Sequence, residues 1–304
     1  MRIVLFIVQL LIITNCSFSQ KRNHNETTKD QSADSATIIS IEPDTLETNQ
    51  ISIASWNLKR FGNTKLNDHA RMSILLDILK QYDIIAIQEV MDVTVTLPQK
   101  LVDSLNVDGL NYNFVASNRV GRGTSKEQYL FVYNDDKVDA FLDSSGYGIE
   151  PMDEFAREPF YCMFKAGEFD FYLMTIHTDP DDVEIEIPAL KVAFDSLQNA
   201  NSENDIILLG DFNACSPGSE IDGYIEMTSL EVIQNIYFAI EGETNTRGGK
   251  SYDNIIFQSS YTSEFVNSGI NVFEAEYNLT NDEAFGVSDH LPVWAIFNID
   301  NDDD

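Results

Sequence analysis

Short apolar runs separated by polar segments recur along the chain from about residue 50 to residue 299. They have the length and composition of β-strands, and several are apolar on both faces, which is typical of sheets buried between other layers. The runs are ISIASWN, DIIAIQE, YNFVAS, YLFVYN, FDFYLMTIH, DIILLGDFN, YDNIIF and LPVWAIF. Two other segments, residues 66–82 and 186–200, repeat their apolar positions with the period of a helix. Strands interleaved with helices predict an α/β domain of stacked sheets covered by helices.

The beginning of the chain has a different pattern. Residues 1–19 combine a basic residue, a short apolar run and small polar residues, which predicts an export signal that is cleaved after Ser19. The alternative is a lipoprotein in which Cys16 carries the lipid. Without that lipid, no stable membrane partner is expected. The protein is therefore expected to be secreted, or else to be a surface lipoprotein.

The polar segments on either side of the strand-rich region set its boundaries. Residues 20–49 are polar, poor in aromatic residues and without a period, which predicts a disordered spacer. Residues 300–304 form a short acidic tail. One folded domain is therefore expected at residues 50–299.

The charge of the chain restricts what it can bind. It holds 50 Asp and Glu against 19 Lys and Arg, a formal net charge of −31. Such a field repels DNA and anionic membranes, so a polyanionic substrate has to be met by a local basic patch or by bound cations. Arg119, Arg122 and Lys126 form one basic island, with no acid before Glu127. The alternative is that this island is an ordinary solvated loop.

Polar residues that can carry chemistry stand at or just beyond one end of several predicted strands. A single Asp or Asn in such a place usually marks only the end of a strand. So many coincidences together favour a common site, and the only histidines besides His24 and His69 belong to the set. The residues are Asn57, Glu89, His177, Asp211, Asn213, Asp253, Asp289 and His290.

This set suits the hydrolysis of a phosphodiester. Glu89 offers hard oxygen ligands of the kind that Mg²⁺ prefers. A histidine can act as a general base on water when a carboxylate fixes its tautomer, as Asp253 could do for His290. Amides such as Asn57 and Asn213 can donate to a phosphate that carries developing charge. Phosphoryl transfer needs little beyond positioning, an activated water and charge neutralisation.

A series of motifs resembles the endonuclease/exonuclease/phosphatase superfamily in order and approximate spacing, and within it the secreted deoxyribonuclease I branch most closely. The motifs are SWNLKRFG, IIAIQEVMD, GRGTSKEQYLFVY, FAREPF, TIHTDPDD, LLGDFNA, YDNIIF and SDHLPV. The resemblance covers about residues 50–299. It implies a four-layer α/β/β/α sandwich of two packed, mostly antiparallel sheets flanked by helices, with the site at the sheet edge where these loops gather. A monomer is the default of this family.

The resemblance implies roles for the matching residues. His177 and His290 would be the acid/base pair, oriented by Glu127 and Asp253 respectively. Glu89 would be the main Mg²⁺ ligand. The scissile phosphate and the metal would be held by Asn57, Asp211, Asn213 and Asp289. Further phosphate contacts would come from Arg157, Tyr252, Lys59 and Arg122.

A structural calcium site in this branch lies partly on a loop that differs here. Asp153 and Glu158 occupy matching acidic positions, but the third position is Ser145. These residues predict a Ca²⁺ site, and the alternative is that they are two ordinary surface acids.

Three positions depart from the family pattern. Met91 stands where the family has an arginine that reaches into the DNA minor groove, and Ser125 where it has a tyrosine that stacks on the sugar. Lys59 replaces an arginine, which keeps the charge but loses the bidentate fork. Hydrolysis should survive these changes, whereas the preference for duplex DNA is in doubt.

The resemblance therefore implies a secreted, divalent-metal-dependent endonuclease that hydrolyses DNA with low sequence specificity and leaves 5′-phosphate ends. One alternative is a phosphodiesterase or phosphatase of the same superfamily that acts on a lipid head group. The sequence offers no aromatic hairpin suited to membrane insertion, and a net charge of −31 opposes approach to anionic lipid. The second alternative is a non-catalytic binding module on the same fold. Retention of both histidines and of both orienting carboxylates speaks against it.

Overall fold

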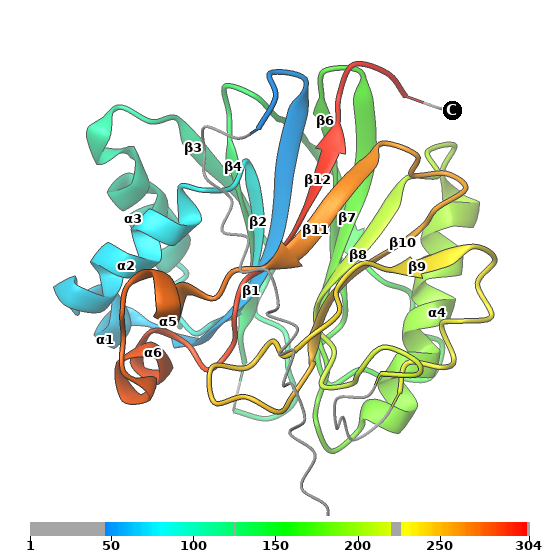
Figure 1. Ribbon diagram of the computed structural model, residues 1–304. Coiled ribbons are helices and arrows are strands. Elements are labelled where there is room, and N and C mark those ends of the chain that lie inside the picture. Colours follow the sequence, from blue (N-terminus) through cyan, green and yellow to red (C-terminus); the bar gives the residue numbers. More distant parts are fainter. Residues whose placement is uncertain (1–45, 125, 220–225, 303–304) are drawn as a thin grey trace, which may run out of the picture. The chain divides into compact units, whose positions relative to one another are not determined.

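A computed structural model describes residues 46–124, 126–219 and 226–302. In this part of the chain two six-stranded sheets pack face to face, with helices on their outer faces (Figure 1). The four-layer α/β/β/α sandwich expected from the sequence is confirmed. The predicted export signal, Cys16 and most of the predicted spacer lie outside the described residues, as does Ser125.

The first sheet has the strand order β11-β12-β1-β2-β4-β3. Its strands are β1 (Gln50–Phe61), β2 (Ile84–Val90), β3 (Tyr112–Ala116), β4 (Gln128–Asn134), β11 (Phe265–Ile270) and β12 (Val293–Asn298). β1 and β2 are parallel, and the other neighbours are antiparallel. A parallel pair needs a crossover connection, which here contains α1 (Asn63–Leu66) and α2 (His69–Leu79).

The second sheet repeats this plan in the order β5-β6-β7-β8-β10-β9. Its strands are β5 (Asp139–Tyr147), β6 (Phe160–Ala166), β7 (Phe169–His177), β8 (Ile206–Asp211), β9 (Ile236–Phe238) and β10 (Asp253–Gln258). β7 and β8 are parallel, joined through α4 (Val183–Ala200), and the other neighbours are antiparallel. Each sheet therefore holds one parallel pair at its centre.

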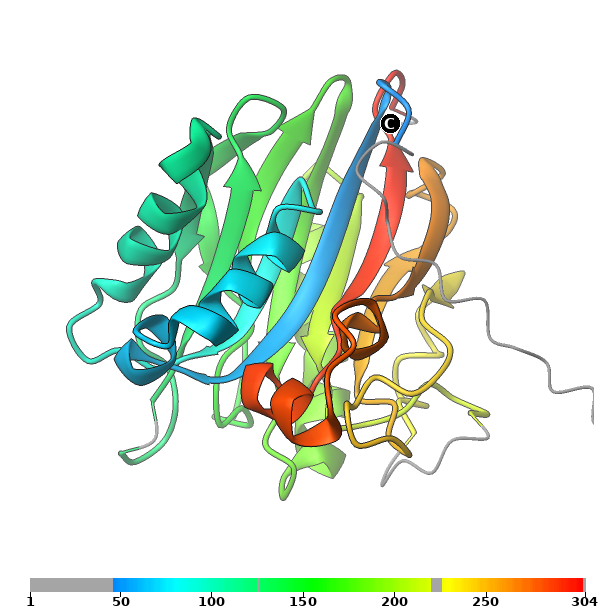
Figure 2. The ribbon, with the colours of Figure 1, turned by 60° about the vertical axis from the view of Figure 1, so that its left-hand side comes forward.

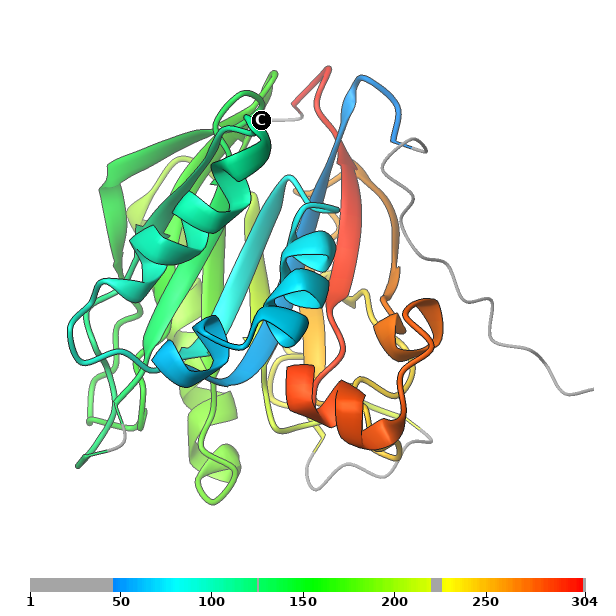
Figure 3. The same ribbon diagram turned by 90° about the vertical axis from the view of Figure 1, so that its left-hand side faces the viewer.

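Apolar side chains fill the spaces between the four layers. Between the sheets lies an aromatic cluster in which Phe131 packs edge-on against Phe164 and Phe169 stacks on Phe171. The outer face of the first sheet is covered by α2, α3 (Leu97–Leu105), α5 (Phe273–Glu276) and α6 (Asn281–Val287), which lie in front of it in Figures 2 and 3. The outer face of the second sheet packs against α4. Full burial of each such large side chain stabilises the fold by about 1.5–3 kcal/mol.

The helices differ in detail from the sequence expectation. The helix predicted over residues 66–82 corresponds to the shorter α2, which begins at His69 because the side chain of Asp68 accepts a hydrogen bond from the backbone N–H of Arg71. The separate short helix α1 ends at Leu66. The other predicted helix begins at Val183, three residues earlier than expected. Several short elements were missed: α3, the 3₁₀ turn η2 (Asn106–Asp108), α5, α6, β5, β6, β9 and β11.

The described part of the acidic tail is bonded to the domain. Asn49 donates a hydrogen bond to the side chain of Asp300, and the backbone N–H of Asp170 donates to the side chain of Asp302.

No helix among the described residues is both long and apolar enough to cross a membrane.

Candidate active site

The two parallel strand pairs bring the predicted site residues to one edge of the sandwich. The carboxyl ends of β1 and β2 carry Asn57 and Glu89, and β7 and β8 end at His177 and Asp211. The antiparallel neighbours run the other way, so their amino ends meet the same edge. Asp253 begins β10, while Glu127 precedes β4 and His290 precedes β12.

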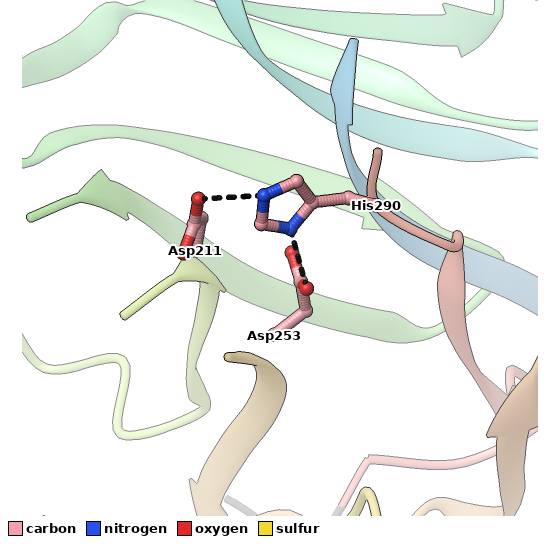
Figure 4. Close-up of side chains that lie close together, drawn as sticks. All are labelled: Asp211, Asp253 and His290. Atoms are coloured by element: carbon pink, nitrogen blue, oxygen red, sulfur yellow. Dashed lines mark hydrogen bonds and ion pairs between the residues drawn. The ribbon is translucent and has the colours of Figure 1, made fainter. Parts of the chain in front are cut away.

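Asp211 lies at the centre of this edge and is only 1% exposed. Its Oδ2 accepts a hydrogen bond from Asn57 Nδ2 at 2.9 Å and lies 3.6 Å from His177 Nε2 and 3.4 Å from His290 Nε2. Figure 4 shows Asp211 on one side of the His290 ring and Asp253 on the other. Burial alone would raise the pKa of Asp211, but the two histidines and the bond from Asn57 hold it below its usual value. Asp211 is therefore a carboxylate.

Each histidine is held by a carboxylate from the opposite sheet. His177 Nδ1 lies 2.9 Å from Glu127 Oε1, and His290 Nδ1 lies 2.8 Å from Asp253 Oδ2. Burial would lower the pKa of both rings, but the attraction of the carboxylates outweighs it. The pKa is raised to about 8 for His177 and to about 10 for His290. In both rings the orienting carboxylate fixes Nδ1, and Nε2 points toward Asp211.

Two buried hydroxyl groups that the sequence did not single out support these pairs. Thr244 Oγ1 donates to Asp253 Oδ2 at 2.7 Å. The backbone N–H of His177 donates to the hydroxyl of Tyr129 at 3.0 Å, and Tyr129 is fully buried. Tyr129 stands in the YLF run two residues after Glu127. Because residues two apart in a strand point to the same side, the sequence could have indicated that Tyr129 lies near Glu127. Thr244 lies in a loop and offered no such indication.

Glu89 is joined to Asp211 through the amide of Asn57. Asn57 Nδ2 donates to Glu89 Oε1 at 3.1 Å as well as to Asp211, and the backbone N–H of Arg60 donates to Glu89 Oε2 at 2.8 Å. Each carboxylate oxygen has two lone pairs, so both oxygens of Glu89 keep capacity for a further ligand.

The backbone at this edge is strained. Four non-glycine residues at this edge have positive φ angles: Lys59 (41°), Arg60 (50°), Glu89 (59°) and Asn213 (46°). The pairing of β1 with β2 and of β2 with β4 also shifts register there, which is the mark of β-bulges. Such conformations cost of order 1–3 kcal/mol each and persist only where surrounding contacts hold them. The bulges turn Glu89 and the end of β1 toward the site.

Lys65 supplies much of that support. Its buried Nζ donates to the carbonyl oxygens of Leu58 at 2.7 Å, Lys59 at 2.9 Å and Val287 at 2.6 Å. Burial lowers the pKa of Lys65 to about 8, so the amine is still charged at neutral pH. Ser288 Oγ adds a bond to the carbonyl of Asn57 at 2.6 Å. Together they tie the strained end of β1 to the loop that carries His290.

The predicted phosphate contacts differ in how they are placed. Arg157 Nε donates to the carbonyl of His177 at 2.8 Å, while its buried Nη2 has no hydrogen-bond partner among the described residues. That unused donor suits an anion. Tyr252 lies with its ring centre 6.4 Å from that of His290. Asn213 Nδ2 donates to the carbonyl of Thr178 at 3.0 Å, so part of its donor capacity serves the loop instead.

The oxygen donors at this edge fit Mg²⁺, which commonly takes one or two carboxylates and keeps waters or phosphate oxygens. Glu89 has free lone pairs, and Asp289 is partly exposed, with its Oδ2 3.8 Å from Lys59 Nζ. Asp211, Asp253 and His290 form a tighter group whose ligand atoms lie within 4.8 Å of one another. Because His290 Nδ1 is already bonded to Asp253, this group suits proton transfer better than metal binding.

The predicted calcium residues have a less suitable environment. Asp153 and Glu158 line a cavity that they share with Arg119, Arg122 and Lys126. Arg122 donates to the carbonyl of Asp153, and its Nη2 lies 3.8 Å from the Asp153 carboxylate. Calcium takes six to eight oxygen ligands, whereas this cavity already holds cationic side chains. Asp153 and Glu158 therefore do not fit Ca²⁺. Arg122 Nη1 also lies 3.9 Å from Asp182 Oδ2.

Glu186 on α4 joins two segments of the site and was missed by the sequence analysis. Its side chain is fully buried; Oε1 accepts from the backbone N–H of Ala156 at 2.7 Å and Oε2 from that of Asp179 at 3.0 Å. Ala156 precedes Arg157 and Asp179 follows His177 by two residues. Glu186 therefore fixes the positions of both segments. Burial raises its pKa to about 7.

Comparison with known proteins gives consistent results. The model of the Endonuclease/Exonuclease/phosphatase family matches residues 54–290. Deoxyribonuclease-1 of Bos taurus is 34% identical over 256 residues, covering 80% of this chain and 90% of the relative. Deoxyribonuclease-1 of Oryctolagus cuniculus is 36% identical over 262 residues, covering 80% and 91%.

Solved structures show the same fold at lower identity. An endonuclease/exonuclease/phosphatase family protein of Bacteroides thetaiotaomicron superimposes with a TM-score of 0.59 at 15% identity, over 84% of this chain and 98% of that one. A mannosyl-6-phosphatase of the same organism gives a TM-score of 0.57 at 16% identity, over 81% and 98%.

The pairing of His177 with Glu127 can be tested by titration. Glu127→Gln removes the charge that raises the pKa of His177, while the burial that lowers it remains. The pKa of His177 should fall below its value of about 8, as measured by NMR of the ring nuclei in EDTA. His290 serves as the internal control, because its carboxylate partner is unchanged. A His177 that still titrates near 8 would contradict the pairing.

The burial of Glu186 predicts a pH-dependent stability. Glu186 has a pKa of about 7 in the folded protein, whereas the ordinary pKa of a glutamate is 4.5. The unfolded chain therefore loses this proton first, and the free energy of unfolding should decrease between these two pH values, by roughly 3 kcal/mol. Glu186→Gln cannot ionise, so urea denaturation from pH 4.5 to pH 7 should show a smaller decrease than in the wild type. Equal decreases would show that Glu186 does not carry this proton.

Proposed function

The chain belongs to the endonuclease/exonuclease/phosphatase family, and on that premise we propose that it is a divalent-metal-dependent endonuclease that hydrolyses phosphodiester bonds in DNA. One observation carries the proposal. Two histidines, each oriented by a carboxylate, direct their Nε2 atoms to one buried carboxylate oxygen of Asp211. The identity of about 34–36% to deoxyribonuclease-1 over 80% of the chain supports a nuclease within this family.

The side chains divide the work of hydrolysis. Arg157 Nη2 is placed to hold the phosphate, since it is buried and has no partner among the described residues. The amide of Asn57 gives its two N–H groups to Glu89 and Asp211 and so positions these carboxylates. Glu89, with Asp289, would hold Mg²⁺. When bound, this ion would neutralise negative charge on the phosphate as it develops.

The two histidines suit opposite proton transfers. With a pKa of about 8, His177 lies closer to neutral pH and is better placed to accept a proton from water. His290, with a pKa of about 10, keeps its proton and suits donation to the leaving oxygen. This assignment reverses the role of base that the sequence suggested for His290. Glu127 and Asp253 orient the rings and stabilise their charged forms.

The remaining parts of the proposal rest on family likeness and on the sequence. We propose secretion through residues 1–19, a monomer, low sequence specificity and 5′-phosphate ends. We expect the protein to contact mainly the phosphates of the DNA backbone and not the bases, because Met91 offers no charged group where the family has an arginine.

Two substrates separate the proposed roles. Nicking of supercoiled plasmid needs protonation of a poor leaving group, whereas bis(p-nitrophenyl) phosphate releases a leaving group that needs no acid. With Mg²⁺, wild-type protein should cleave both substrates, and EDTA should abolish both activities. His177→Ala should lose both activities by about 10²-fold or more, whereas His290→Ala should lose mainly plasmid nicking.

The exposed His69 provides a matched control, and His69→Ala should behave as the wild type. Folded protein that cleaves neither substrate, or that cleaves a phospholipid head group instead, would refute the endonuclease. Equal losses of the two activities in His290→Ala would refute its role as the acid.

A further inference from the structure

We propose that Arg247 and Lys59, both stacked on the ring of Phe285, form a second phosphate site that binds the DNA backbone beside the scissile phosphate. The inference rests on the proposed endonuclease function and adds a binding residue, Arg247, that the sequence analysis did not identify. It also concerns how a chain of charge −31 can hold a polyanion.

The two cations lie over one aromatic ring. Lys59 Nζ lies 2.6 Å from the centre of the Phe285 ring, and the guanidinium carbon of Arg247 lies 3.4 Å from it. One phenylalanine ring therefore contacts both a lysine and an arginine.

The three residues come from three segments that each carry part of the catalytic edge. Lys59 is in β1, and its backbone N–H donates to Asn57 Oδ1 at 2.9 Å. Phe285 is in α6, five residues before His290. Arg247 lies in the loop between β9 and β10, next to Thr246, whose backbone N–H donates to the carbonyl of Asp289 at 2.9 Å. In the same loop, Asn245 and His290 form an isolated antiparallel β-bridge through their backbones. The stack is therefore fixed to the site through the backbone.

The surrounding charges leave Arg247 available to a phosphate. Its side chain is 53% exposed, and its ion-pair partner is Asp282, which lies 3.6 Å away and is 96% exposed. Exposed pairs of this kind contribute little to stability, so the exchange of Asp282 for a phosphate costs little. Lys59 is more enclosed and lies near Asp289. Of the two cations, Arg247 is therefore the one that presents its charge to solvent.

The ring gives this site its rigidity. A cation on an aromatic face is attracted to the ring, and this attraction holds the long side chain in place before the substrate arrives. Ordering such a side chain on binding would otherwise cost conformational entropy. A planar guanidinium can stack on the ring and still direct N–H groups outward, which an ammonium does less well. The site therefore favours arginine at position 247.

The test is steady-state cleavage of plasmid DNA by the full chain with Mg²⁺ over a series of KCl concentrations. Arg247→Ala should raise KM by about fivefold and reduce the salt dependence of log KM by about one unit of slope, because one phosphate contact is lost. The turnover number should change by less than twofold. Phe285→Leu keeps the apolar volume but removes the aromatic face, and it should produce a smaller rise in KM.

A charge-matched control lies at the opposite edge of the first sheet. Lys80 follows α2, just before β2 begins, and pairs with the exposed Asp108. Lys80→Ala changes the net charge by the same amount and should leave KM and its salt dependence as in the wild type.

The outcomes separate this inference from the proposed function. Arg247→Ala that lowers thermal stability without changing KM or its salt slope would make the stack purely structural and overturn the inference. An equal effect of Lys80→Ala would reduce it to net charge alone. In both cases the endonuclease would stand, because the wild type cleaves DNA. A wild type that does not cleave DNA would refute the endonuclease itself.

Discussion

The structure depends on one buried carboxylate that faces a histidine of its own sheet and a histidine from the other sheet. Asp211 ends a strand of the second sheet and accepts a hydrogen bond from Asn57 of the first. The two histidine–carboxylate pairs also cross between the sheets, in opposite directions. A buried charge is tolerated only when it is paired with good geometry. The relative position of the sheets at this edge is therefore set by the same groups that would do the chemistry.

Hydrogen bonds from the surrounding residues stabilise the strained backbone and the buried polar groups of this arrangement. Three non-glycine residues at the ends of β1 and β2 have positive φ, and Lys65 and Ser288 hold that backbone with hydrogen bonds. Just below the edge, Gln88 Nε2 donates to Ser55 at 3.0 Å in its own sheet and to Thr175 at 2.9 Å in the other. These contacts are polar and directional, unlike the aromatic core between the sheets. They fix geometry at a place where apolar packing alone would allow the sheets to slide.

The sequence predicted the parts of the site that lie on regular strands. Asp211 and His177 end apolar runs, and the position of a polar residue after such a run follows from the strand itself. Glu127 was assigned only through the family resemblance, because it precedes its strand in a charged loop. Lys65, Glu186 and Arg247 had no signal of their own. Lys65 and Glu186 bind backbone atoms, and one partner of Lys65 lies 222 residues away in the chain. Arg247, in a loop, stacks on a ring of α6. Backbone partners leave no residue type to recognise.

The most direct test of this account is the titration of both histidines in Asp211→Asn, followed by NMR without metal. The negative charge of Asp211 raises the pKa of His177 and of His290, and asparagine keeps the shape of the side chain without that charge. If one carboxylate couples the two rings, both pKa values should fall in this variant, with each ring still bonded to its own orienting carboxylate. A shift in only one histidine, or in neither, would show that Asp211 does not join the two halves of the site.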